Sequence, residues 1–149
     1  MISFPNCKIN LGLHIVEKRA DDFHELETVF FPLPWSDILE ITPTTGDRPG
    51  ADFKGTGTRI YGSKEENLCV RAYQTLAAEH ALGPVKMHLH KIIPIGAGLG
   101  GGSSDAAFVL KSLDKIFQLG LSNETLERHA ATLGSDCPFF IQNKPVYAT

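Results

Sequence analysis

The chain has 149 residues, of which 42% are apolar and 21% are charged, values that exclude a disordered or membrane-embedded class and favour a globular domain. A formal net charge of −3 excludes the basic surface that drives non-specific nucleic-acid binding. The three cysteines form no CxxC pair, and the sequence contains neither a recognisable export signal nor an apolar run long enough to span a membrane. We therefore expect one cytoplasmic domain without nucleic-acid or membrane partners, and the sequence does not indicate its oligomeric state.

The first third of the chain predicts a meandering sheet. Residues 6–16, 25–33 and 37–42 mix apolar and polar positions with β-branched side chains, a pattern typical of strands. From Thr42 to Gly62 the chain is rich in Gly, Thr, Pro and Asp, which predicts a loop with at most one short hairpin.

Helices and strands alternate in the rest of the chain. Asn67 can cap a helix whose apolar residues recur at three- and four-residue steps and which ends before Gly83. Residues 85–92 alternate apolar and polar side chains, as in a strand with one buried face. Apolar positions over 106–117 share one helical face, another helix begins near Ser122, and the last four residues look like a strand. The predicted class is α/β or α+β, a sheet backed by helices.

The segment that joins the predicted strand to the next helix carries the clearest chemical signal. Residues 94–107 read PIGAGLGGGSSDAA, with five glycines in seven positions directly before a helix. Glycines let backbone amides approach a ligand closely, and the helix points its positive end to the same place. This combination predicts a cradle for a polyphosphate.

The glycines at positions 96, 98 and 101 also satisfy the spacing GxGxxG, which is a weak signal by itself. A dinucleotide fold would need an acidic residue at the end of a second strand about 20 residues further on, where this chain has Leu119, Gly120 and Leu121. A protein kinase would need a Val-Ala-Ile-Lys strand downstream, and the sequence has none. Neither alternative fits the rest of the chain.

The glycine segment resembles the phosphate loop of the GHMP kinases, Pro-x-x-x-Gly-Leu-Gly-x-Gly-Ser-Ser-x-Ala-Ala. Within that family, the triple glycine and three further segments are similar to the branch whose substrate is a cytidine-diphosphate-linked sugar alcohol. These segments are PNCKINL at 5–11, RADDFHEL at 19–26 and GSDCP at 134–138. Asp22 departs from the usual glycine of the second segment, and Phe23 stands where tyrosine is common.

The resemblance implies the fold of the GHMP kinase N-terminal domain, of the ribosomal protein S5 domain 2-like type, over residues 1–149. It also implies that the C-terminal GHMP domain is absent from this chain and that the chain alone has little activity. The implied reaction uses ATP and Mg²⁺ to phosphorylate the 2-hydroxyl of the cytidine-diphosphate substrate, a step in the non-mevalonate route to isoprenoids.

Roles for individual residues follow from the same resemblance. Asp136 corresponds to the catalytic base and Lys8 to the cation beside it. Asn10 corresponds to a substrate-holding residue, and Phe23 and His24 to residues that hold cytosine by stacking and hydrogen bonds. The residues expected to bind ATP are Asn67, Leu68, Lys91, Pro94, Gly96, Gly98, Leu99, Gly100, Gly101, Gly102, Ser103 and Ser104.

Several of these assignments compete with simpler interpretations. Asn67 could serve only as a helix cap, and a lysine at the end of a strand, such as Lys91, is usually solvated. A magnesium ion could bind Ser103 or Ser104, and we expect Ser104 to be its ligand. His88 and His90 share a strand face, but with no third ligand within reach we expect an exposed pair without a structural role.

Two other functions stay open at this point. Another GHMP kinase, of the mevalonate or homoserine type, would share the phosphate loop but would have no use for Phe23 and His24. A non-catalytic nucleotide-binding module would use the loop alone.

Overall fold

The computed structural model describes residues 1–18, 24–46 and 48–148, without the side chains of residues 15–18 and 24–26. In chain order, its elements are β1 (Ile2–Ser3), β2 (Asn6–Lys18), β3 (His24–Ser36), β4 (Ile38–Pro43), β5 (Ala51–Gly57), α1 (Leu68–Ala77), β6 (Val85–Lys91), α2 (Gly101–Phe117), α3 (Asn123–Ala131), α4 (Phe139–Gln142) and β7 (Val146–Ala148). None of the helices in these described ranges combines the length and the apolar character needed to cross a bilayer.

The strands form two sheets, and the chain contributes to each of them in two separate segments. One sheet has the order β1-β4-β6-β5, in which β5 runs parallel to β6 and the other pairs are antiparallel. The other sheet has the order β2-β3-β7, with β2 and β3 forming a long antiparallel ribbon. Because β3 ends at Ser36 and β4 begins at Ile38, a single residue, Asp37, separates the two sheets along the chain.

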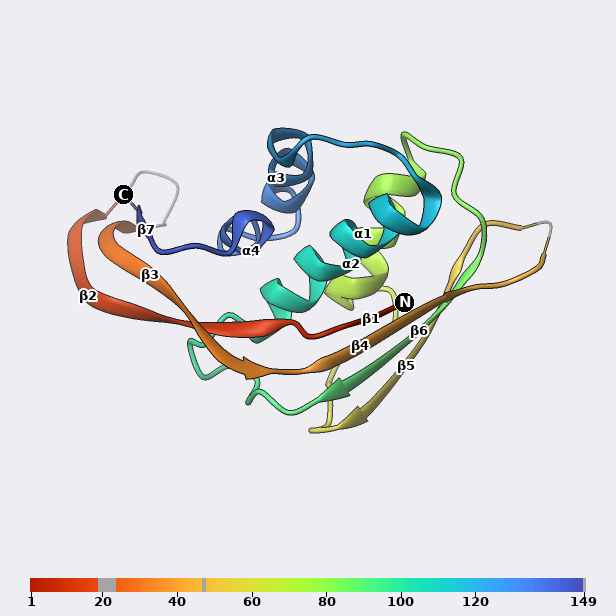
Figure 1. Ribbon diagram of the computed structural model, residues 1–149. Helices are drawn as coiled ribbons and strands as arrows, with labels where there is room; N and C mark the ends of the chain where they lie inside the picture. Colours follow the sequence, from red (N-terminus) through yellow and green to blue (C-terminus); the bar gives the residue numbers. More distant parts are fainter. Residues whose placement is uncertain (19–23, 47, 149) are drawn as a thin grey trace.

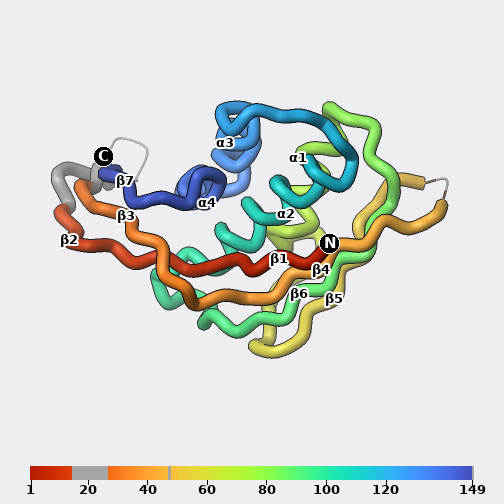
Figure 2. The backbone as a smooth tube through the Cα atoms, in the orientation of Figure 1, coloured from red at the N-terminus to blue at the C-terminus, as the bar shows by residue number. Residues whose placement is uncertain are grey.

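Helices cover one side of the sheets, as Figure 1 shows, and the backbone tube in Figure 2 has the same layering. The burial along β6 alternates strictly, since Val85, Met87 and Leu89 are buried whereas the residues between them are exposed. Helices α1 and α2 pack over that buried face with side chains such as Leu76 and Leu110, both fully buried. The core therefore lies between the four-stranded sheet and the helices, and the glycine loop joins the end of β6 to the start of α2 beside it.

Most of the predicted elements are confirmed. Both helix caps are present: Asn67 accepts a hydrogen bond from the backbone amide of Cys69 at 2.9 Å, and Ser122 accepts one from Thr125 at 3.2 Å. The helix after Asn67 ends at Ala77, earlier than the limit set by Gly83, because the chain turns at residues 78–82.

The prediction of a loop from Thr42 to Gly62 was wrong in its central part. Residues 51–57 form β5, which pairs in parallel with β6 rather than in a hairpin. Only Phe53 of this strand is buried, so the period-two apolar pattern that reveals a strand is missing. The strand is held by a partner that follows it by some 30 residues, which local composition cannot show.

Candidate functional site

A cavity of about 370 Å³ lies at the glycine loop, between the end of β6 and the start of α1 and α2. The first turn of α2 faces this cavity through Gly101, Gly102 and Ser103. The first amides of a helix have no partner within the helix, and the first turn of α2 contains no acidic residue that could occupy them. The cavity therefore presents hydrogen-bond donors and the positive end of a 17-residue helix to an anion.

At two positions of the loop, neighbouring side chains leave no room for a Cβ atom. Gly100 has a φ of +67°, and a Cβ there would lie 2.9 Å from Phe140 Cζ and 3.2 Å from Lys8 Cε. A Cβ on Gly101 would lie 2.9 Å from Lys91 Nζ and equally close to Ile93 Cγ2. A side chain at either position would require a neighbour to move, Phe140 or Lys8 at Gly100 and Lys91 or Ile93 at Gly101.

Lys8 and Asp136 meet beside this loop. The Lys8 backbone amide donates to the carbonyl of Leu99 at 2.9 Å, which fixes β2 against the loop. The Lys8 ammonium lies 3.3 Å from Asp136 Oδ2 and donates to Asn10 Oδ1 at 2.7 Å. It also lies 4.5 Å from the centre of the Phe30 ring. Its side chain is 6% exposed and that of Asp136 is 33% exposed, so the carboxylate is the more accessible partner.

Lys91 has very different surroundings on the other side of the loop. Its ammonium, 3% exposed, contacts Asp37 Oδ2 at 2.5 Å and Asp105 Oδ2 at 2.8 Å. The other oxygen of Asp37 accepts the backbone amides of Ile92 and Ile93. These contacts join the link between the two sheets, the end of β6 and the first turns of α2.

The electrostatics of this buried cluster are uneven. Burial raises the pKa of the Asp105 carboxyl to about 7, although the Lys91 ammonium opposes the rise. Burial acts to lower the pKa of Lys91, but the Asp105 and Asp37 carboxylates outweigh it and raise that pKa above its ordinary value. Asp105 Oδ1 also has no hydrogen-bond partner, whereas Asp37 uses both oxygens. Asp37 is therefore the firm counterion of Lys91, and the Asp105 carboxyl, whose pKa burial raises, is the weaker one.

The structure brings most of the predicted nucleotide-binding residues to the cavity. Asn67 and Leu68 line it from the start of α1, so the capping role of Asn67 and a place at the cavity coexist. The remaining predicted residues that line it are Lys91, Pro94, Gly96, Gly98, Leu99, Gly100, Gly101, Gly102 and Ser103.

Ser104 is the exception among the predicted nucleotide-binding residues. Its side chain is fully buried, its hydroxyl has no hydrogen-bond partner, and it is not part of the cavity wall. Ser103 is half-buried and lines the cavity. The geometry therefore favours Ser103 over Ser104 as the hydroxyl available to a ligand.

The predicted cytosine-binding residues can be placed only in part. Phe23 lies outside the described residues, and His24 is described only as the first residue of β3, paired with Lys18 at the far end of the ribbon.

Sequence reasoning did not find several residues of the site. Asp37 and Asp105 were missed because their partner, Lys91, is 54 and 14 residues away along the chain. Tyr61 and Glu66 line the cavity from the segment between β5 and α1, which carried no motif.

His88 and His90 are exposed, and both rings lie within 3.0 Å of the Thr56 hydroxyl.

Known proteins share both this sequence and this fold. A family model described as "GHMP kinases N terminal domain" matches residues 67–144. A protein of Bacteroides fragilis named 4-diphosphocytidyl-2-C-methyl-D-erythritol kinase is 55% identical over 148 residues, which is 99% of this chain and 54% of the relative. A protein of the same name from Cytophaga hutchinsonii is 51% identical, over 99% of this chain and 53% of the relative.

Solved structures agree with these matches. A crystal structure of 4-(cytidine 5'-diphospho)-2C-methyl-D-erythritol kinase superimposes with a TM-score of 0.82 and 38% identity, over 99% of this chain and 51% of that one. Homoserine kinase from Cytophaga hutchinsonii superimposes with a TM-score of 0.61 and 14% identity, over 76% of this chain and 35% of that one. At this level of identity the match shows the fold alone. The chain spans about half the length of the curated relatives it matches. It has the fold and the phosphate loop of a GHMP kinase N-terminal domain, and it belongs to the GHMP kinase family.

Proposed function

We propose that this chain supplies the ATP-binding and catalytic N-terminal domain of a kinase that phosphorylates 4-(cytidine 5'-diphospho)-2-C-methyl-D-erythritol at its 2-hydroxyl. The observation that carries the proposal is the position of Lys8 and Asp136, 3.3 Å apart and directly against the glycine loop. The relatives that share over half of their aligned residues with this chain bear the name of that kinase.

The proposed transfer assigns separate tasks to the two sides of the loop. The α2 amides and the helix dipole bind the ATP phosphates in the cavity and hold the terminal phosphoryl group in place. Asp136 accepts the proton of the substrate hydroxyl as the new oxygen–phosphorus bond forms and the bond to ADP breaks. Lys8 stabilises the negative charge that develops between them, because its ammonium is nearly buried and therefore weakly screened.

Asn10 and the cavity wall position the two substrates. Asn10 accepts a hydrogen bond from Lys8, which orients the ammonium and leaves the Asn10 amide donors for the substrate. Asn67, Leu68 and Tyr61 line the cavity where the base of the nucleotide would lie. Phe23 and His24 are proposed to hold the cytosine at the ribbon end.

The donor set at the cavity fits magnesium, which prefers oxygen ligands and is usually held through phosphates with few protein contacts. Ser103 would provide the protein ligand, since its side chain lines the cavity. When bound, the ion neutralises charge on the phosphates of ATP. The residues of this chain would still carry out the proton transfer and the positioning.

The proposal is tested by measuring ADP formation with the full-length protein, ATP and magnesium, with the cytidine-diphosphate substrate, mevalonate or homoserine as acceptor. We expect turnover only with the cytidine-diphosphate substrate, and competition by cytidine nucleotides. Equal turnover with mevalonate or homoserine would support another member of the family, and ATP binding without turnover of any acceptor would support the non-catalytic module.

A matched pair of variants then tests the cytosine contact. His24→Ala in the full-length protein is expected to weaken binding of the cytidine-diphosphate substrate far more than binding of ATP. His90→Ala, which removes an exposed histidine on β6, should change neither. An equal loss of affinity for both ligands in His24→Ala would indicate a structural role for this residue.

A further inference from the structure

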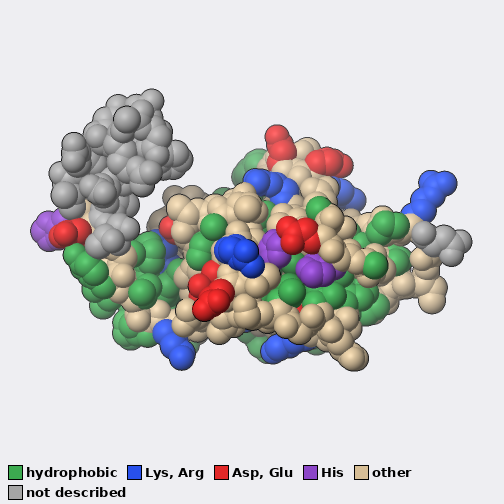
Figure 3. Space-filling view, turned by 90° about the horizontal axis from the view of Figure 1, so that it is seen from above, with side chains coloured by type: hydrophobic (Ala, Val, Ile, Leu, Met, Phe, Trp, Pro, Cys, Tyr) green, Lys and Arg blue, Asp and Glu red, His purple; other side chains and the backbone are tan. Residues whose placement is uncertain are grey.

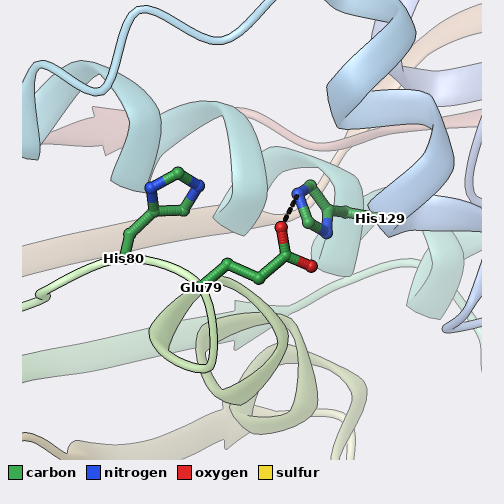
Figure 4. Close-up of side chains that lie close together, drawn as sticks. All are labelled: Glu79, His80 and His129. Carbon is green, nitrogen blue, oxygen red and sulfur yellow. Dashed lines mark ion pairs between the residues drawn. The ribbon is translucent and has the colours of Figure 1, made fainter.

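Away from the nucleotide cavity, three side chains that commonly bind metal ions come together at the ends of two helices. Glu79 and His80 follow the end of α1, and His129 lies in the last turn of α3. One ligand atom from each lies within 4.8 Å of the other two, and among the residues that the structure describes no other three such side chains come together in this way. Figure 4 shows Glu79 between the two imidazoles, and in Figure 3 histidine and acidic side chains lie side by side on the helical face.

His129 has an unused ring nitrogen in this group. Its side chain is only 8% exposed, yet its buried Nε2 atom has no hydrogen-bond partner. The nearest carboxylate oxygen, of Glu79, is 3.8 Å away, which is too far for a hydrogen bond. A buried polar atom without a partner costs free energy, and a bound ion is one of the few arrangements that would satisfy it.

The position also suits a cation electrostatically. Two helix C-termini, those of α1 and α3, converge on the group, and each carries a partial negative charge. Glu79 adds a full negative charge at the surface, since this residue is exposed. A divalent ion there would be attracted by all three charges.

We propose that Glu79, His80 and His129 bind a divalent transition-metal ion of the zinc class, with water as the fourth ligand. Two imidazoles and a carboxylate suit zinc, whereas magnesium prefers oxygen ligands alone. Tetrahedral bonds of about 2.0–2.1 Å place ligand atoms about 3.3 Å apart. The exposed Glu79 and the half-exposed His80 can close the remaining distance by side-chain rotation, while His129 stays fixed.

The bound ion would join the end of α1 to the end of α3. The start of α1 lines the nucleotide cavity at Asn67 and Leu68, and α3 leads within seven residues to Asp136. The ion would therefore stabilise the packing of two helices that support the site, without contact to ATP or substrate.

The first test is a calorimetric titration of the metal-free full-length protein with Zn²⁺ in the presence of excess Mg²⁺. A second titration uses Co²⁺ as a spectroscopic probe of four-coordinate geometry. We expect saturable binding of zinc and a higher unfolding temperature in its presence. His80→Gln and Glu79→Gln remove ligands at exposed positions and should not impair folding. Loss of a residue that only supports a metal ligand typically weakens metal binding about 10- to 100-fold. Loss of a ligand itself, as in each of these variants, should weaken zinc binding by at least this much.

His88→Gln is the matched control, because this histidine is exposed on β6 and pairs with Thr56 rather than with the group. It should bind zinc as tightly as the parent protein. The proposal is overturned if the parent shows no saturable zinc binding, or if His80→Gln and Glu79→Gln bind zinc as tightly as the parent does.

Discussion

Two lysines flank the glycine loop, and their surroundings differ. Lys8 is placed to act on a substrate, whereas Lys91 is placed to stabilise the fold. Lys8 faces one carboxylate, Asp136, at 3.3 Å, and that carboxylate is one-third exposed. Lys91 is held by two buried carboxylates, Asp37 and Asp105, at 2.5 and 2.8 Å. The carboxylate of the first pair is open to a substrate, whereas the ammonium of Lys91 is engaged by two carboxyl groups within the protein.

Each lysine also rests against its own glycine. A Cβ on Gly100 would meet Lys8, and a Cβ on Gly101 would meet Lys91. The loop is thus fitted to both lysines at once, and changes on the two sides should have different consequences. Those on the Lys8 side should lower turnover, and those on the Lys91 side should lower stability.

The largest effect is expected for Asp136→Asn in the full-length enzyme. The change keeps the shape of the side chain but removes the proposed base, so turnover should fall by roughly 10²- to 10⁴-fold while the protein stays folded and binds both substrates. Steady-state kinetics would measure the loss. Near-parental turnover would rule out Asp136 as the base.

The same measurement can be extended to the pair. Lys8→Met keeps an unbranched apolar stem over Phe30 but removes the charge. Because the two residues act as one unit, the double variant should lose less than the product of the two single losses. Fully multiplicative losses would argue against coupling.

The next largest effect is expected for Asp37→Ala, which should destabilise the protein without a specific effect on catalysis. Removing one partner of a buried ion pair typically costs about 3–5 kcal/mol, and the remaining contact of Lys91 with Asp105 should keep the loss toward the lower end of that range. The change also leaves the amides of Ile92 and Ile93 without their acceptor. Urea denaturation would give the difference in free energy of unfolding.

Asp37→Asn is the control for that experiment. Its amide oxygen can still accept the two backbone hydrogen bonds, so it isolates the lost charge and should be less damaging than Asp37→Ala. If both variants were as stable as the parent, the buried cluster would have no structural role.

A smaller effect is expected for Gly101→Ala. The added methyl group would lie 2.9 Å from Lys91 Nζ and Ile93 Cγ2, and overpacking of this kind costs about 1–3 kcal/mol. Gly102→Ala is its neighbour and control, because a Cβ there meets only Leu68 Cδ1 at 3.7 Å. Thermal unfolding should separate the two variants, and equal stability would show that the loop adjusts to the contact with Lys91.

A last prediction concerns the pH dependence of stability, measured without nucleotide or metal. The pKa of Asp105 is about 7 in the folded chain, against an ordinary value of 3.8. Between these values the unfolded carboxyl has lost its proton and the folded one retains it, so this residue makes stability fall as pH rises. Asp105→Asn should flatten the decline, whereas Asp52→Asn, at an exposed position on β5, should not. An unchanged pH profile in Asp105→Asn would contradict the raised pKa.

The helix after Asn67, the strand over 85–92 and the helix over 106–117 were predicted because their apolar residues follow a regular period, whereas the long strands were predicted from their mixture of apolar, polar and β-branched residues. Residues 85–91 show this well, since every second side chain is buried and the pattern was visible in the sequence. Strand β5 could not be predicted in the same way, because it buries only Phe53 and depends on pairing with β6. The four-residue helix α4 is too short to show a period.

The candidate site divides similarly. The glycine loop has a local signature, and its place between a strand and a helix was predicted and is confirmed. Lys8 and Asp136 lie 128 residues apart, and only the resemblance to a family connected them before the structure showed their contact. Asp37 carries no local signal, because its importance comes from the turn between two sheets and from a lysine far along the chain.

The bulge at Gly12 constrains how the β2–β3 ribbon can vary in length. The register of the two strands shifts between Leu11 and Leu13, and Gly12 adopts a φ of +72° while its carbonyl accepts the Thr28 hydroxyl. Side chains alternate between the two faces of a strand, so one extra residue exchanges the faces of everything beyond it. The parity of the residue count between Lys8 and Leu13 therefore decides which face of the ribbon the residues just beyond the bulge present. Loss of Gly12 alone would reverse the faces of Leu13 and His14 relative to Lys8, whereas a change of two residues would preserve them.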